Sequence, residues 1–555
     1  MQQVHSRPTE GRPAPSRAIS RTDLPTVILH WALVATLAIS VSTGLRIAAD
    51  DGAPTWRAWL EPLLMEGQVS QWHVLSALAF VAIVAGYVFF LRRSDQTSRL
   101  AVYRAALKAA DHRARWSARN RLIYWVALAL LAVITVTGVL MYYLPGLLPN
   151  RLITTIHQIA TWGLLLYVLA HVLGQLVLGG WRQLLKIVNP RWAYAGAAAL
   201  ALAGAGALAL ATGALDAFTV GDLHMARIAS ATAPQGMPAQ DQWQQAKPMQ
   251  IHTTHGANFP GGEATVTVRA LHDEKYAYFQ YEWADSTHSR KHLPLVKTEQ
   301  GWKLLNDNYW ANNETQFYED KFAVLLANTS AIAGGTANLG SNPLPGKPAP
   351  ANGRGMHFTT DGSLADMWHW KANRTGMLKQ IDDNFFGPAL QPEDGKRYTG
   401  GYGQDKKSAG GYDTNWKRID KTDFITPKRL PKDWAALRER MGPVSLDPNV
   451  SEQGVFHMWD EETVAYSKEL DDAIPVGTVM PSVLHSKPFE GDRGDVTANG
   501  VWRDGRWRLE IRRPLDTQSK SDLQIKTGVY MWVAAFNHAQ TQHTRHMRPL
   551  RIVLD

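Results

Sequence analysis

The sequence predicts an α-helical membrane bundle, made of four helices plus a fifth span, followed by a mainly antiparallel β-sandwich domain. Three observations predict this fold class. Residues 24–216 are mostly Ala, Leu, Val and Ile, in runs long enough to cross a bilayer. Residues 217–555 are polar and aromatic, and several segments alternate apolar and polar side chains as strands do. The 555 residues include no cysteine, which excludes disulfides, thiolate metal sites, iron–sulfur clusters and covalently attached haem.

Five apolar stretches are long enough to be spans, because a hydrocarbon core of about 30 Å is crossed by about 20 apolar residues in a helix. They cover residues 25–45, 72–92, 122–144, 153–179 and 192–216. The first is too long for a signal peptide and no small-residue cleavage pattern follows it. The fifth is rich in Ala and Gly, so we expect it to pack closely on another helix. The sequence therefore predicts a tail (1–23), a four-helix membrane domain (24–190) and a fifth helix (191–216).

The charges predict the orientation. Residues 91–121, between two spans, hold nine Arg or Lys against two Asp, as cytoplasmic loops do. The N-terminal tail is also basic, and the loop after the first span is net acidic. Both features predict a multi-pass protein of the bacterial inner membrane, with a cytoplasmic N-terminus. Five spans then place the C-terminal domain in the periplasm. We expect no nucleic-acid partner despite the net charge of +9, since basic arms seldom lie between spans.

The rest of the chain is predicted to be a linker (217–249) and an outer β-sandwich (250–555). Period-2 alternation is clearest in segments 263–271, 275–284, 501–513, 528–537 and 550–555. The Asp-Gly pair in WRDGRW predicts a hairpin turn. Residues 327–450 are rich in Gly, Pro, Asn and Asp, which predicts long loops.

The first four spans contain four histidines: His30, His73, His157 and His171. Given the orientation, His30 and His171 lie towards the cytoplasm, whereas His73 and His157 lie towards the outside. His157 and His171 are 14 residues apart, which is about 21 Å of rise and close to whole helical turns, so they share a helix face. The histidines therefore form two pairs at matching depths.

Paired imidazoles in a helical bundle favour a b-type haem, which takes two neutral histidines as axial ligands and needs no cysteine. Isolated polar residues hydrogen-bonded across helices would also explain single histidines. A bound transition metal or a proton relay would use histidines too, but no carboxylate accompanies them at the same depths in spans one, two and four.

RTDLPTVILHW, the Trp-His at the head of span two and IHQIATWGLLLYVLAH resemble the bacterial di-haem cytochrome b561 family over residues 20–190. They also resemble the membrane cytochrome subunits of nickel hydrogenases and formate dehydrogenases. The resemblance implies a four-helix bundle with two b haems, and quinone or quinol as redox partner. It also implies that His30, His73, His157 and His171 are the four haem ligands. The fifth span and the long tail depart from the short family members.

A second resemblance covers residues 250–555. HTTHGANFPGG, YEDKFAVLLAN and above all DMWHWKANRTG resemble the haem-binding γ subunit of ethylbenzene and dimethylsulfide dehydrogenases. That resemblance implies a β-sandwich with one b haem held by Met and Lys. Met356 matches the methionine, with His357 beside it. No lysine occupies the C-terminal stretch FNHAQTQHTRHMRPLRIVL, so His546 is the expected substitute, with further contenders at His538, His543, Met547 and His255.

Several simpler interpretations stay open for the outer domain. Its histidines could be ordinary surface residues, and its tryptophans sheet-face or core aromatics. An aromatic-rich sandwich could also bind sugars through exposed rings. Asp382-Asp383 and Asp471-Asp472 are expected in polar loops, solvated or cation-binding rather than catalytic. No catalytic residues are predicted, because the chain has no nucleophile elbow, zinc-protease motif or phosphate loop in context.

The sequence thus favours a membrane-bound b-type cytochrome of a respiratory chain. It would pass electrons between the quinone pool and a periplasmic redox partner through two membrane haems and one outer haem. Whether it is itself an enzyme stays open. One alternative is the membrane anchor and electron-transfer subunit of a periplasmic molybdenum oxidoreductase. The other is a non-redox, membrane-anchored ligand-binding or sensory sandwich.

Overall fold

A computed structural model describes residues 22–52, 56–60, 63, 65, 69–108, 110–330, 359, 361–388 and 402–555. The chain forms two compact units. The first contains residues 1–37, 77–135 and 157–212, and the second contains 38–76, 136–156 and 213–555. The long helices contribute to both units, whereas all the strands of the C-terminal sheet domain (221–555) belong to the second.

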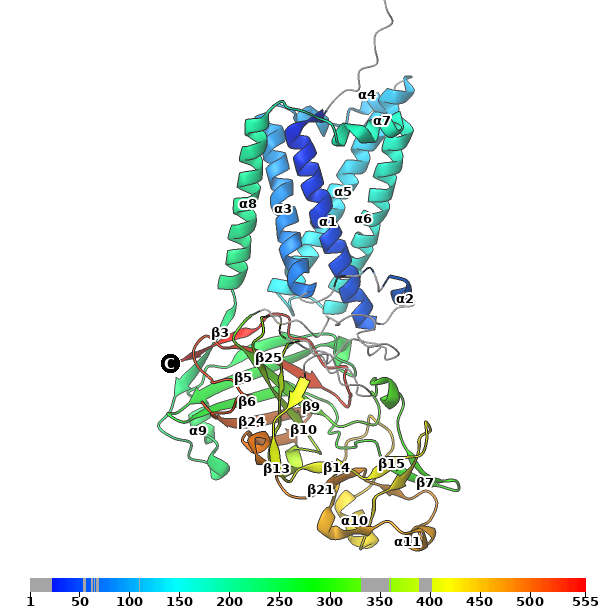
Figure 1. Cartoon of the computed structure of the whole chain (residues 1–555), viewed down its shortest axis with the longest axis vertical. Coiled ribbons are helices and arrows are strands. Elements are labelled where there is room, and N and C mark those ends of the chain that lie inside the picture. The colour runs from blue at the N-terminus through cyan, green and yellow to red at the C-terminus, as the bar shows by residue number, and fades with distance from the viewer. Residues whose placement is uncertain are drawn as a thin grey trace, which may run out of the picture. The chain divides into compact units, whose positions relative to one another are not determined.

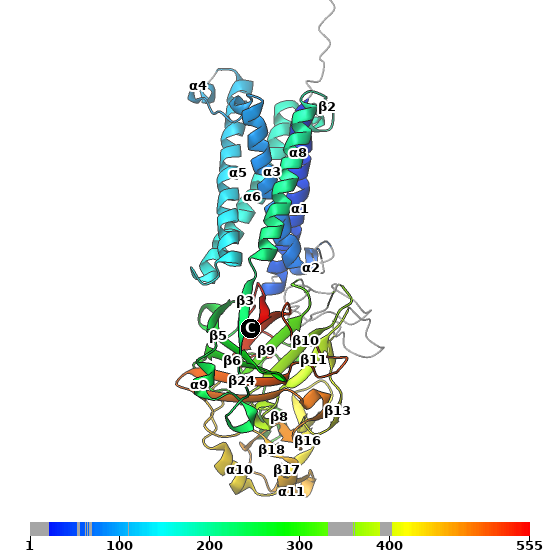
Figure 2. The same ribbon diagram turned by 90° about the vertical axis from the view of Figure 1, so that its left-hand side faces the viewer.

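Five long helices carry the five predicted spans (Figures 1 and 2). They are α1 (Leu24–Gly52), α3 (Val69–Arg93), α5 (His112–Tyr143), α6 (Asn150–Gly179) and α8 (Ala195–Phe218). All five are long and apolar enough to cross a membrane. Side chains such as Leu166 and Leu210 stay about two-thirds or more exposed, as lipid-facing residues do. Helix α5 begins about ten residues before its predicted span, because its Arg- and Ala-rich start also favours a helix.

The fifth helix packs closely on α3, which confirms the expectation from its small residues. A Cβ built on Gly86 of α3 would lie 3.2 Å from the Cβ of Ala205 on α8. Leu29, Phe90 and Ala201 are buried together nearby. Small side chains let the two backbones approach, and lipid cannot enter between them.

The sheet domain is built on one twelve-stranded sheet in the order β12-β11-β10-β9-β25-β26-β3-β5-β6-β24-β23, with β4 paired to β5. Most neighbours are antiparallel, but β3 runs parallel to β26 and β5. The five alternating segments form β5 (Ala264–His272), β6 (Tyr276–Ala284), β23 (Thr497–Arg503) with β24 (Arg506–Pro514), β25 (Tyr530–Phe536) and β26 (Leu550–Leu554). The other strands are β3 (Gly221–Arg227), β4 (Met249–Thr253), β9 (Lys321–Ala327), β10 (Ala365–Lys371), β11 (Asp382–Phe386) and β12 (Tyr402–Gln404).

The two halves of this sheet face each other across one hydrophobic core, as a sandwich does. Trp283 of β6 stacks on Phe322 of β9, with ring centres 4.7 Å apart, although the two strands are distant in the sheet order. Trp368, Trp370 and Trp507 are buried in the same core. The predicted Asp-Gly hairpin turn is confirmed between β23 and β24, where both turn residues have positive φ.

Two expectations about loops were wrong. The predicted linker contains β3, whose pairing with β26 and β5 joins the two sheet halves. The predicted long loops of 327–450 contain β10 and β11 at the centre of one half, and several three-residue strands. Such short strands pair with partners far away in the sequence, so local alternation does not reveal them.

A smaller lobe with its own hydrophobic core extends the sheet domain. It includes a five-stranded sheet in the order β15-β16-β8-β7-β20. These strands are β7 (Leu295–Thr298), β8 (Gly301–Leu304), β15 (Trp416–Arg418), β16 (Phe424–Pro427) and β20 (Val479–Met480). Two short helices, α10 (Trp434–Met441) and α11 (Lys468–Asp472), belong to this lobe. Asp471 of α11 is buried, accepting a hydrogen bond from Trp302 and pairing with Lys297, so it is structural rather than solvated.

Candidate functional site

The structure brings His30 of α1 and His171 of α6 together. Their ring centres are 6.4 Å apart and their planes are inclined by 39°. With metal–nitrogen bonds of about 2 Å, two imidazoles on opposite sides of one iron have ring centres roughly 6 Å apart. The separation of this pair therefore fits axial ligation of one haem.

Aromatic side chains surround His171. The rings of Tyr124 and Tyr167 lie 5.5 Å and 5.7 Å from it. The hydroxyl of Tyr124 accepts hydrogen bonds from Asn120 and Gln175, which hold the ring in place. The Nδ1 atom of His171 is buried and has no hydrogen-bond partner among the described residues. The histidine therefore lies in a mostly apolar, aromatic wall of the kind that flanks a porphyrin.

His73 of α3 is oriented by its neighbours on α1. Its Nδ1 lies 3.1 Å from the carbonyl oxygen of Ser40 and 3.0 Å from the Thr43 hydroxyl. Because the carbonyl can only accept, the ring donates from Nδ1 and keeps its lone pair on Nε2, the arrangement typical of a metal-bound histidine. A Cβ on Gly44 would lie 3.1 Å from the ring carbon Cε1, so the glycine makes room for the imidazole.

His157 lies on α6, half-buried, fourteen residues before His171. Its pairing with His73 stays a prediction.

Arg46 of α1 was not singled out in the sequence, yet it is fully buried two residues after Gly44. A buried cation inside a candidate span is costly unless it meets an anion, so its position is informative.

The expected ligands of the outer haem are spread over several places. Met356 and His357 lie outside the described residues. The Nδ1 of His546 accepts a hydrogen bond from the backbone N–H of Val533 at 3.3 Å. Burial lowers the pKa of His546 to about 3, so the ring is neutral and its proton is on Nε2. That tautomer leaves Nε2 without the lone pair that iron requires.

The other candidate ligands of the outer haem are His543, His538, His255 and Met547, and their surroundings differ. His543 is buried and donates from Nδ1 to the Thr544 carbonyl oxygen at 2.7 Å, which leaves the lone pair on Nε2. His538 is buried next to β25, and burial lowers its pKa to about 4. His255 adopts a positive φ of 64° and its ring meets the Thr254 hydroxyl. Met547 is 36% exposed.

Sequence reasoning missed His369, which lies inside the DMWHWKA string. Its Nε2 is buried and has no hydrogen-bond partner among the described residues. Burial, together with the charges of Lys371, Lys321 and Arg374, holds the pKa of His369 well below its usual value. The ring is therefore neutral, the form that binds iron. The string itself was the available signal, because alternation along a strand places His369 opposite the core-facing Trp368 and Trp370.

His369 lies on a face of the sheet that also carries Lys321, Met367 and Trp532. Its neighbours across the strands are Ala323 of β9 and then Ala534 of β25. The ring of Phe536 stacks on His369 at 5.4 Å and contacts His543 at 5.1 Å.

Lys321 lies on this face too, with its Nζ donating to the Gln540 carbonyl oxygen at 2.7 Å. Burial and the neighbouring Arg374 and Lys371 hold the pKa of Lys321 well below its usual value. A neutral amine is the form of lysine that can bind iron.

These observations define the class of the protein: a multi-pass membrane protein with b-type cytochrome features, joined to a β-rich domain. The model of the family described as prokaryotic cytochrome b561 matches residues 21–190. The model of the family described as ethylbenzene dehydrogenase matches residues 240–548, more than half of the chain. The chain belongs to the ethylbenzene dehydrogenase family and carries a cytochrome b561 domain before that region, which confirms both resemblances.

A search of curated proteins found no match. Among solved structures, one match is a protein of Bacteroides uniformis ATCC 8492 that is provisionally described as carbohydrate-binding. It is 8% identical and covers 61% of this chain and 100% of its own, with a TM-score of 0.24. A similarity of this size does not support an argument about fold or function.

Proposed function

We propose that the protein transfers electrons between the quinone pool and a periplasmic redox partner through three b haems, two in the membrane domain and one in the sheet domain. The observation that carries this proposal is the opposed pair His30 and His171, with ring centres 6.4 Å apart. When bound, each haem iron supplies reversible one-electron chemistry, and the protein supplies ligands and surroundings.

In the cytoplasmic half of the bundle, His30 and His171 would hold the first haem. Tyr124 and Tyr167 would line its faces and keep water from the ring. Trp31 anchors α1 at this end by donating to the Ile187 carbonyl oxygen at 2.8 Å. The Tyr124 hydroxyl, already fixed by two amides, would limit rotation of the His171 ring.

In the other half, His73 and His157 would hold the second haem. The Ser40 carbonyl oxygen fixes the His73 tautomer, and Gly44 leaves space for the ring. The N-terminus would be cytoplasmic and the sheet domain periplasmic, as the basic 91–121 segment predicts.

In the sheet domain, His369 is our first choice for a ligand of the third haem, because its buried Nε2 meets no hydrogen-bond partner among the described residues and the ring is neutral. For the opposite ligand, the tautomers favour His543 over His546. Met356, implied by the family resemblance, stays the other candidate. The face of the sheet beside His369 would receive the ring of the haem.

A second candidate function keeps all three haems but makes this chain the membrane subunit of a periplasmic molybdenum oxidoreductase. Membership of the ethylbenzene dehydrogenase family favours it. Copurification of a large soluble subunit with the tagged chain would support it, and a chain that purifies alone yet is reduced by quinol would favour the first.

The test of the proposed function is quinol reduction of purified full-length protein in detergent. We expect a short-chain quinol to reduce part of the haem quickly, seen as the sharp α-band of a low-spin b haem. The His30→Ala variant should lose the fraction bound to this pair. A protein that carries haem but is reduced only by dithionite would contradict the link to quinol, and a colourless protein would favour a non-redox binding domain.

A further inference from the structure

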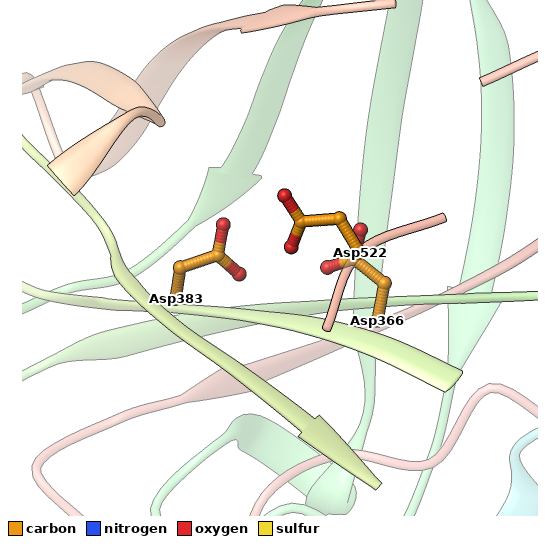
Figure 3. A group of neighbouring side chains, drawn as sticks. All are labelled: Asp366, Asp383 and Asp522. Carbon is orange, nitrogen blue, oxygen red and sulfur yellow. The ribbon is translucent and has the colours of Figure 1, made fainter. Parts of the chain in front are cut away.

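A group of buried carboxylates lies in the sheet domain, apart from every histidine discussed above. Asp366 of β10, Asp383 of β11 and Asp522 come together from three segments of the chain (Figure 3). One carboxylate oxygen from each lies within 4.8 Å of the others. Asp405, Asp492 and Asp522 form a second such group, so Asp522 is common to both.

The strand register explains why these acids meet. In the β10–β11 pair, Asp383 lies opposite Trp368 and Asp366 lies opposite Phe385. Both acids therefore point to the side of the sheet on which Trp368 is buried. Asp405 directly follows β12, Asp492 begins the short helix η9 (Asp492–Gly494), and Asp522 lies in the connection between β24 and β25. Five separate segments thus supply carboxylates to one place.

Among the residues that the structure describes, few positive charges meet these acids. Arg513, fully buried, pairs with Asp366 at 2.8 Å and with Asp522 at 3.1 Å. Arg493 is nearby but is bonded to Asp382, which points to the opposite face of β11. The charge of this one arginine, Arg513, therefore acts on four acids, namely Asp366, Asp383, Asp495 and Asp522.

Several of the carboxylate oxygens are buried without a hydrogen-bond donor. Asp366 and Asp383 are fully buried and Asp405 is 3% exposed. Both oxygens of Asp405, Oδ2 of Asp383, Oδ1 of Asp366 and Oδ1 of Asp522 accept no hydrogen bond within the described part of the chain. Buried carboxylates are almost always paired, hydrogen-bonded or bound to a metal, so this group requires a further positive partner.

We propose that these aspartates bind calcium, with Asp522 shared between the two carboxylate groups. Ca²⁺ takes six to eight oxygen ligands at about 2.3–2.6 Å, so two oxygens on one ion are at most about 5 Å apart. The 4.8 Å limit within each group meets this condition. Zinc and copper prefer ligand sets that include nitrogen or sulfur, which neither group contains. Mg²⁺ demands a small octahedral shell and usually keeps several waters, which a site this rich in carboxylates does not favour.

The cation would join the β24–β25 connection and η9 to strands β10 and β11.

Protonation of the carboxylates is the competing way to neutralise this group. Burial and the neighbouring carboxylates raise the pKa of Asp366 and Asp495 to about 7 and that of Asp405 to about 8. The two differ in the expected effect of added metal: Ca²⁺ binding raises Tm, whereas protonation alone leaves Tm unchanged by calcium.

The experiment uses full-length protein in detergent, treated with a chelator and then exchanged into metal-free buffer. Thermal unfolding is followed by tryptophan fluorescence with and without CaCl₂ or MgCl₂, and bound metal is measured by elemental analysis. We expect one or two Ca²⁺ per chain and a rise in Tm of several degrees with calcium, larger than with magnesium. A ligand that binds only the folded state must raise Tm in this way.

The variants are Asp383→Asn and, as matched control, Asp516→Asn, an exposed residue of the same connection. The Asp383→Asn protein should bind Ca²⁺ at least ~10-fold more weakly and lose the calcium-dependent rise in Tm, because it removes one of few charged ligands. Without metal it should melt at or above the wild-type temperature, since it removes a buried charge. The control should respond as wild type.

Wild-type protein that retains no Ca²⁺ and melts at one temperature with calcium or chelator would overturn the proposal in favour of protons. Stabilisation by Mg²⁺ equal to that by Ca²⁺ would overturn the choice of calcium. If Asp383→Asn fails to fold, the wild-type titration decides alone.

Discussion

The helical bundle and the sheet domain place their candidate ligands in different ways. In the bundle, His157 and His171 are fourteen residues apart on one helix, and the helical repeat alone puts them on one face at two depths. In the sheet domain, His369 and His543 both contact Phe536 although 174 residues separate them, because β9 and β25 bring β10 and the C-terminal stretch together. Spacing along the sequence therefore predicts candidate ligands in a helical bundle, whereas in a sheet it predicts only the face on which they lie.

The largest expected effect comes from breaking the pair in the bundle. His171→Ala should remove one b haem, because the loss of one of its two imidazole ligands weakens its attachment to the bundle. The haem-to-protein ratio and the difference spectrum of purified protein measure this loss. Ile159→Ala, at a lipid-facing position of the same helix, is the control and should keep the wild-type ratio. An unchanged ratio in the His171 variant would refute the assignment.

The corresponding change in the sheet domain is His369→Ala, compared with the exposed His224→Ala. We expect loss of one haem with the other two retained, so the remaining spectrum should be that of a bis-histidine cytochrome. Substitution of a membrane histidine should impair reduction by quinol. The His369→Ala substitution should leave quinol reduction of the two remaining haems unchanged. If the haem content stays at the wild-type level, then His543 with Met356 becomes the preferred pair.

Two consecutive acids on opposite faces of β11 offer a sharper comparison within the sheet domain. Asp382 is paired with Lys371 and Arg493, which against the effect of burial lower its pKa to about 2. Asp382→Asn should destabilise the fold by about 3–5 kcal/mol, because it leaves two buried cations without a counter-ion. The stabilisation from Asp382 is present above its unfolded pKa near 3.8 and is lost as the pH falls towards 2.

Denaturant unfolding at neutral pH measures this difference, with Asp383→Asn in metal-free buffer as the partner experiment. Equal destabilisation by both substitutions would show that the two acids have similar surroundings, contrary to the two ion pairs of Asp382.

A smaller effect is expected from Gly44→Ala, since the added Cβ would press against the His73 ring at 3.1 Å. The ring must shift by a few tenths of an ångström, so we expect a changed midpoint potential of one haem rather than its loss. Gly206→Ala on α8, where a Cβ meets nothing within 4 Å, is the control. Redox titration followed at the α-band measures the shift, and identical potentials in all three proteins would argue against a haem beside His73.

The sequence predicted the spans, the strands with long alternation and the Asp-Gly turn, because each of these follows from local periodicity or local backbone preference. It did not predict β3 or the strands within 327–450. Leu223 and Met225 of β3 are the only strongly apolar positions of a short strand, so its signal was weak. The buried Asp383 was expected in a polar loop, solvated or cation-binding, because nothing local reveals that it lies in a strand on which four other segments converge.

Local sequence patterns also predicted the candidate haem ligands only in part. The four membrane histidines could be named because apolar surroundings make any histidine conspicuous. His369 could not be singled out as a candidate ligand from the sequence. Its surroundings are formed by Phe536 and Ala323, which come from other strands. The choice between His543 and His546 depends on which ring nitrogen meets a backbone carbonyl and which meets an N–H.

The central claim is that iron porphyrin is held inside the bundle by histidines of different helices, and haem stoichiometry tests it most directly. Pyridine haemochrome analysis of purified full-length protein, set against protein mass from amino-acid analysis, should give three b haems per chain, and one fewer for His171→Ala. Protein from haem-replete cells that shows no Soret absorption, or a His171→Ala variant with the same stoichiometry as wild type, would contradict the account.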